Sequence, residues 1–177
     1  MNTATITSHN QIIPATRRST HSLPRKKQVR DGEIAKKLIH AWDTKGDKEL
    51  LLNVFIKEKD LLSDERYWEL LRSTWIICGN IKNIPTFRKM FESKRPKRNW
   101  FSTPEEIARL NSLPEIFTVY RAQNGEEING ISFTLSLAVA QTYKFKFDKD
   151  RIITKEIKRS DVFAFIERNG EEEVLIL

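Results

Sequence analysis

The sequence predicts an α+β fold, in which a helical N-terminal segment is packed on a small mixed β core. Two observations predict it. Between residues 31 and 100 the apolar residues recur at intervals of three and four, the spacing of an amphipathic helix. From residue 117 onward the chain shows short β-prone runs separated by turn residues, which is typical of strands. A chain of 177 residues is long enough for one well-packed domain or a core with a small helical lobe.

Residues 1–30 are predicted to form a disordered basic tail. They are rich in Ser, Thr and Asn, and they hold few residues that can build a core. They contain six Lys or Arg residues and no acidic one, and so carry +6 of the net charge of +7. This composition also resembles an organelle transit peptide, although a solvated tail is favoured. Because the remaining 25 basic and 24 acidic residues nearly cancel, nucleic-acid binding would depend mainly on the tail.

Residues 31–109 are predicted to be a helical segment. Asp31 is expected to cap its first helix and Ser63 a later one, since short polar side chains accept hydrogen bonds from the first turn. Ile84-Pro85 interrupts the helical pattern. Thr103-Pro104-Glu105-Glu106 has the form of a helix start, with an N-cap threonine, proline at the first position and glutamate at the third.

Residues 110–177 are predicted to form the β core, with about five strands and one helix. The expected helix starts at Ser136 and ends near Lys146, and Asp148–Asp150 is an expected turn. The expected strands are Phe117–Arg121, Ile131–Thr134, Arg151–Ile157, Val162–Ile166 and Glu173–Leu177.

Several classes of site find no support in the sequence. Cys78, the single cysteine, lies in an apolar run and is expected to be a buried, inert thiol in a reducing compartment. The three histidines lie within the first 40 residues, far from Cys78, so a Cys-His nucleophile is not expected. The absence of zinc-type spacing and of a Gly-rich phosphate loop predicts neither a metal nor a nucleoside triphosphate. No apolar run approaches the roughly 20 residues of a membrane span, and we expect a cytoplasmic protein without membrane contacts.

Three motifs in the last third of the chain carry candidate chemistry. Arg121 ends an apolar strand, Ser132-Phe133-Thr134 leads from a strand into a helix, and Glu171-Glu172-Glu173 opens the last strand. Singly, these motifs are typical of a surface charge, a helix cap and a solvated turn. Side chains alternate along a strand, so Glu171 and Glu173 point to one face and can serve one site, with Glu172 on the other.

The order and spacing of these motifs resemble the R-S-E arrangement of the toxin-like ADP-ribosyltransferases of phages and bacteria. Arg121 matches the arginine of that arrangement, Ser132 and Thr134 match its Ser-x-Ser/Thr element, and Glu171 and Glu173 match its Glu-x-Glu pair. The resemblance covers roughly residues 110–177. The sequence departs from the family pattern at two positions. Directly after Arg121, where many relatives have glycine, this chain has alanine, and the middle residue of the Ser-x-Ser/Thr element is Phe133.

The resemblance implies an enzyme that uses NAD as co-substrate, splits off nicotinamide and transfers ADP-ribose. Arg121 would bind the diphosphate, for which a guanidinium is well suited. Glu173 would be the essential carboxylate that stabilises positive charge on the ribose. Ser132 would hold Glu173 or the ribose, and Glu171 would orient or deprotonate the acceptor. Thr134 would belong to the NAD site, and Phe133 or Tyr143 would pack on nicotinamide.

The expected acceptor is a protein side chain, with arginine favoured because a Glu-x-Glu pair accompanies that preference in the family. The expected setting is a phage or bacterial effector. One alternative is a catalytically degenerate module that binds and inhibits a partner protein. Another is a nucleic-acid binder that acts through its basic tail, or through Lys94–Arg98 beside Trp100, although a solvated loop is the favoured interpretation there.

Overall fold

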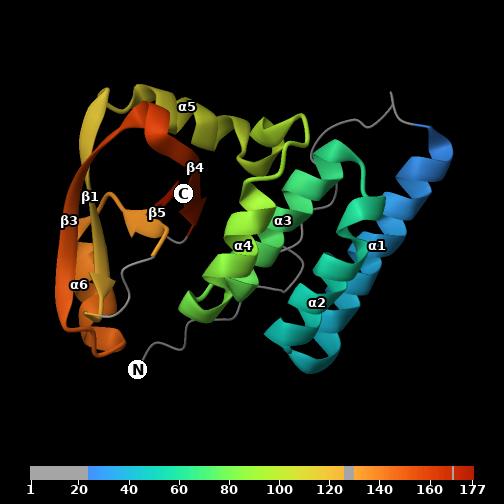
Figure 1. Ribbon diagram of the computed structural model, residues 1–177, viewed down its shortest axis with the longest axis horizontal. Helices are drawn as coiled ribbons and strands as arrows, with labels where there is room; N and C mark the ends of the chain where they lie inside the picture. Colours follow the sequence, from blue (N-terminus) through green and yellow to red (C-terminus); the bar gives the residue numbers. More distant parts are fainter. Residues whose placement is uncertain (1–23, 126–129, 169) are drawn as a thin grey trace. The chain divides into compact units, whose positions relative to one another are not determined.

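The computed structural model describes residues 24–125, 130–168 and 170–177, and shows a mixed α+β fold (Figure 1). The described residues divide into two compact units. One runs to Gly79 and also includes Lys94–Trp100, and the other consists of Asn80–Ser93 and Phe101–Leu177. Residues 1–23 of the expected disordered tail lie outside the described residues. The prediction of disorder is wrong for Arg25–Arg30, which form the first turns of a helix.

The first unit contains three helices: α1 (Arg25–Lys45), α2 (Lys48–Glu58) and α3 (Asp64–Cys78). The prediction that Asp31 caps α1 is wrong, because the helix already begins at Arg25, directly after Pro24. Asp31 is instead buried within the helix, where its carboxylate accepts hydrogen bonds from the backbone N–H of Ser63, at 2.9 Å, and from the Ser63 hydroxyl. The acidic side chain therefore joins α1 to the start of α3.

The prediction for Ser63 is confirmed, since its hydroxyl accepts the backbone N–H of Arg66 as the N-cap of α3. Helix α3 supplies much of the core of this unit. Its largest buried apolar residues are Tyr67, Trp68, Leu70, Leu71 and Trp75.

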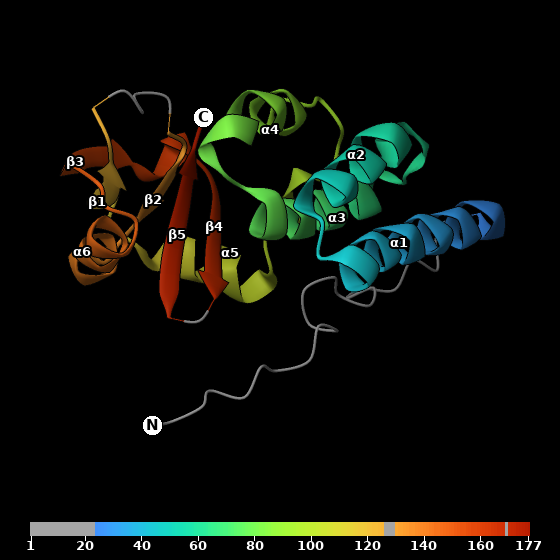
Figure 2. The ribbon, with the colours of Figure 1, turned by 90° about the horizontal axis from the view of Figure 1, so that it is seen from below.

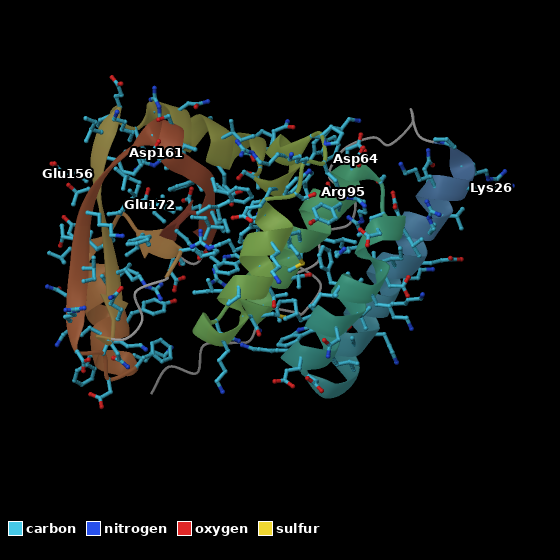
Figure 3. The ribbon with its side chains drawn as sticks, viewed as in Figure 1. Lys26, Asp64, Arg95, Glu156, Asp161 and Glu172 are labelled. Carbon is cyan, nitrogen blue, oxygen red and sulfur yellow. The ribbon has the colours of Figure 1, made fainter. Side chains whose placement is uncertain are left out.

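The basic segment Lys94–Arg98 is held against this helical unit. The Arg95 guanidinium stacks over the Tyr67 ring at 4.6 Å and lies 3.4 Å from the Asp64 carboxylate (Figure 3). It also donates to two backbone carbonyls, those of Lys59 and Leu62. Lys97 forms an ion pair with Glu65. These contacts give the basic segment a structural role, and Lys97 and Arg95 are not simple solvated charges.

The second unit contains α4 (Ile84–Phe91), α5 (Pro104–Ser112), α6 (Leu137–Lys146) and all five described strands. The strands are β1 (Ile116–Gln123), β2 (Ser132–Thr134), β3 (Arg151–Lys158), β4 (Val162–Arg168) and β5 (Glu171–Ile176). They form one sheet in the order β3-β1-β2-β5-β4. The expected mixed sheet is antiparallel at every described pairing, because each strand runs opposite to its neighbours, and β4 and β5 are joined by a tight turn at Gly170.

One face of this sheet forms the apolar core of the unit. Val119, Phe133, Phe165 and Val174 lie there, and Leu110 of α5 packs against them. Helix α5 begins as predicted, with a reciprocal hydrogen-bond pair between Thr103 and Glu106. Helix α6 packs beside β1, β2 and β3, as Figure 2 shows for β1. Its N-cap is Ser136, the residue at which the expected helix starts.

Candidate active site

The candidate site lies on the sheet face opposite the apolar cluster. In an antiparallel pair, directly opposed residues share a face. The register opposes Ser132 to Leu175 and Thr134 to Glu173, whereas Phe133 is opposed to Val174 in the core. The sequence-predicted Ser132, Thr134 and Glu173 therefore share one face of β2 and β5.

Ser132 links two of the predicted residues by direct hydrogen bonds. Its hydroxyl donates to Oε1 of Glu173 at 2.6 Å, and its backbone carbonyl accepts from Nη1 of Arg121 at 2.8 Å. Glu173 is only 8% exposed, so this hydroxyl contributes to the solvation of a nearly buried carboxylate. The three residues singled out by the sequence thus form one connected set.

Gly130 makes the contact with Arg121 possible. A Cβ atom placed on Gly130 would lie 2.2 Å from Nε and 2.3 Å from Cζ of Arg121, well inside the distance at which two atoms can pack. The guanidinium therefore occupies the space that any other side chain would need. Gly130 belongs to the site because it admits Arg121, a role that its place in the sequence motif does not reveal.

Glu171 receives contacts from both sides. The Tyr143 hydroxyl, reaching from α6, donates to Oε1 at 2.7 Å, and Nε of Arg168 lies 3.8 Å from Oε2. Burial, and secondarily the hydrogen bond to Glu171, raises the pKa of Tyr143 to about 12. Since a neutral phenol is a donor, the raised pKa keeps Tyr143 able to donate to Glu171 over the whole physiological range.

Glu172 points away from this set, as alternation along the strand predicted. Its carboxylate accepts from Nη2 of Arg109 at 2.7 Å, on helix α5 (Figure 3 labels Glu172). Of the three consecutive glutamates, the outer two therefore face the candidate site and the middle one joins the sheet to α5.

Two other predicted residues have contacts of their own. The Thr134 hydroxyl accepts the backbone N–H of Ser136 at 3.2 Å and so stabilises the turn into α6. Phe133 is 5% exposed and packs in the apolar cluster, with Nζ of Lys155 lying 5.1 Å from its ring centroid. The structure does not bring Phe133 to the face of Ser132 and Glu173, so of the two aromatic residues predicted for the site only Tyr143 is there.

Tyr120 is a site residue that sequence reasoning missed. It is opposed to Thr134 across β1 and β2, and Thr134 is opposed to Glu173 across β2 and β5. Tyr120 therefore stands in the same row as Glu173, one strand beyond Thr134. Strand alternation places Tyr120 opposite in direction to Arg121, and the register shows that Tyr120 is the one on the face of Glu173. Arg121 starts from the face of Val119 and reaches the set through the backbone carbonyl of Ser132.

Comparison of the chain with protein-family models, with curated proteins and with solved structures gives no match. Within the described residues, no group of three or more His, Cys, Asp and Glu side chains could hold a metal ion. None of the helices in the described ranges is both long enough and apolar enough to cross a membrane.

Proposed function

We propose that this protein is an ADP-ribosyltransferase that cleaves NAD between nicotinamide and ribose and transfers ADP-ribose to an acceptor. The observation that carries the proposal is the connected set Arg121–Ser132–Glu173, in which Ser132 bonds the arginine through its carbonyl and the glutamate through its hydroxyl. These bonds support the proposal because they directly connect the arginine, the serine and the glutamate that the resemblance singles out.

The chemistry required for this reaction fits the side chains present. As the glycosidic bond to nicotinamide breaks, its electron pair leaves with nicotinamide and positive charge grows on the ribose. A carboxylate beside the ribose stabilises that charge, and it does so more strongly where water is excluded. Glu173 is the nearly buried carboxylate of the set, and the Ser132 hydroxyl fixes its orientation.

Arg121 is the candidate for the diphosphate of NAD. A guanidinium has five N–H donors in a rigid fork, which suits paired hydrogen bonds to phosphate oxygens. Glu171 lies at the start of β5 and accepts a hydrogen bond from Tyr143 of α6. The resemblance implies that Glu171 would orient or deprotonate the acceptor, and Tyr143 would lie beside it. In this proposal Tyr143 also takes the aromatic role beside nicotinamide.

The test is nicotinamide release from NAD by the purified chain, with and without cell lysate. We expect release by the wild type and a fall of about 10²- to 10³-fold in Glu173→Gln, which keeps the size of the side chain and removes its charge. Glu172→Gln is the matched control, because it removes the same charge from the neighbouring position on the other face of the strand. It should stay within about twofold of the wild type, as expected of a surface change.

Two outcomes would contradict the proposal. One is equal loss in Glu172→Gln and Glu173→Gln, which would indicate a general effect of charge on the strand. The other is a wild type that neither releases nicotinamide nor binds NAD by calorimetry, which would favour the module that engages a partner without catalysis.

A further inference from the structure

The C-terminal end of α6 and the turn after it lie directly beside Glu171. Tyr143 donates to Glu171, and the Phe147 ring centroid lies 5.4 Å from that of Tyr143. Nζ of Lys146 in turn lies 5.3 Å from the Phe147 ring centroid. We name residues Tyr143 to Arg151 the α6 terminal surface. This surface therefore extends outward from the candidate site through a chain of direct contacts.

This surface exposes aromatic side chains to an unusual degree. Phe145 is 92% exposed and Phe147 is 50% exposed, whereas six of the other phenylalanines are buried: Phe55, Phe87, Phe91, Phe101, Phe133 and Phe165. Phe163 is half-buried and packs against Phe91 and Phe101. Exposed large apolar side chains that gather at one place mark a binding surface. Neither phenylalanine contributes to the apolar core of the unit.

The aromatic residues alternate with basic ones. Within the α6 terminal surface, Lys144, Lys146, Lys149 and Arg151 outnumber Asp148 and Asp150, for a net charge of +2 (four minus two). Asp150 turns back toward β1, since its carboxylate accepts the backbone N–H of Gly125 at 3.1 Å. Ammonium groups interleaved with exposed aromatic rings suit a ligand that carries both phosphates and flat bases.

Two groups already contact the carboxylate that a cationic acceptor would use, that of Glu171. A guanidinium acceptor would need the carboxylate oxygens of Glu171, but Oε1 already accepts from Tyr143 and Oε2 lies 3.8 Å from the positive Arg168. A guanidinium that approached Oε2 would therefore also meet the positive charge of Arg168, and like charges repel each other. A neutral nucleophile, such as a nitrogen or oxygen atom of a nucleobase, meets no such repulsion.

From these observations we infer that the acceptor is a single-stranded nucleic acid, bound on the α6 terminal surface with its bases stacked on Phe145 and Phe147. The inference rests on the proposed function and names its acceptor class. Unpaired bases are required because only they expose their faces for stacking. In the transfer, the bond from ribose C1′ to nicotinamide breaks, a bond from C1′ to a base nitrogen or oxygen forms, and the proton of that atom passes to Glu171.

The surface is tested first by binding, which needs no NAD. A fluorescent single-stranded DNA, and an RNA of the same sequence, are titrated with the full chain at several salt concentrations. Phe145→Ala should weaken binding roughly tenfold, the typical loss of one stacked base. Lys144→Gln with Lys146→Gln should weaken it and lower the salt slope by about 1.4, since each phosphate contact to a single strand contributes about 0.7.

Lys158→Gln is the control for a lysine outside the α6 terminal surface, because Lys158 lies at the end of β3 opposite to Arg151. Lys158 lies seven residues from Arg151 along this strand, roughly 23 Å at about 3.3 Å per residue. Its affinity should equal that of the wild type. All the variants keep residues 1–30, so their differences report on the surface alone. Equal affinity in the wild type, Phe145→Ala and the double lysine variant would overturn the inference, as would tighter binding to a duplex of the same sequence.

The acceptor itself is identified with NAD labelled in its adenylate half. The wild type is offered the single strand, agmatine as a mimic of the arginine side chain, and lysate protein freed of nucleic acid. We expect label on the single strand. Label on agmatine or on protein, but not on the strand, would overturn the inference while leaving the transferase proposal standing. Failure of the wild type to release nicotinamide would instead contradict the proposed function, whatever the strand affinity.

Discussion

At the scale of single residues, Tyr143 is distinguished by the hydrogen bond that its hydroxyl donates to Glu171. Burial and the hydrogen bond to that carboxylate raise its pKa to about 12, from an ordinary value of about 10. The folded protein therefore binds the phenolic proton more tightly than the unfolded chain does. The stability contributed by this difference is fully present below about pH 10 and is lost as the pH rises to about 12.

This predicts a late tyrosine titration that is specific to the folded state. The tyrosinate absorbance of the wild type minus that of Tyr143→Phe should rise with a midpoint near pH 12. The same difference measured in denaturant should rise near pH 10. A native midpoint near 10 would show that the phenol does not donate to a carboxylate in solution.

The candidate site was only partly predictable at this scale. The common face of Glu171 and Glu173 follows from strand alternation, so it was predicted from the sequence alone. The bond from Arg121 to the Ser132 carbonyl and the place of Tyr120 depend on the register of β1 with β2. Register is set by pairing between strands that are distant in the sequence, so local patterns do not reveal it.

At the scale of elements, the start of α5 depends on Glu106 more than on any other side chain. Its Oε2 accepts the backbone N–H of Thr103 at 2.7 Å, and its Oε1 accepts the backbone N–H of Glu167 in β4 at 3.0 Å. The same carboxylate therefore closes the helix cap and attaches α5 to the sheet. Glu106 is almost fully buried, so its loss would leave backbone donors without an acceptor.

We therefore predict a graded loss of stability at this cap. Thr103→Ala should lower the free energy of unfolding by about 1 kcal/mol, the usual effect of removing an N-cap side chain. Glu106→Ala should lower it by about 2–3 kcal/mol, because unsatisfied donors add to the lost cap. Urea unfolding followed by circular dichroism measures both values. Glu105→Ala, in the same turn but exposed, is the control and should change the value by about 0.5 kcal/mol or less.

The helix ends show which local signals can be trusted. Ser63 and Thr103 were predicted as caps and are caps, because each is followed by a turn whose N–H groups the side chain reaches. Asp31 carried the same local signal, but its carboxylate bonds to Ser63, 32 positions away in the chain. A buried partner that lies far away in the sequence overrides a capping preference of about 1 kcal/mol.

At the scale of the whole molecule, the division into two units separates the candidate site from the helices α1 to α3. All of the residues proposed for NAD and for the acceptor belong to the unit that contains the sheet. The α+β class was predictable because the period of the apolar residues changes once along the chain. The antiparallel order β3-β1-β2-β5-β4 was not, since many strand orders satisfy the same local pattern.

Cys78, at the end of α3, gives the helical unit its own reporter. The thiol is the only one in the chain, it is buried, and burial raises its pKa to about 12. Because thiolate is the reactive form, a disulfide reagent should modify native protein only as fast as this unit opens, and should modify denatured protein at once. Rapid labelling of the native chain would contradict the buried position. Timed labelling thus distinguishes inactivation that begins in the helices from damage confined to the sheet, without any engineered probe.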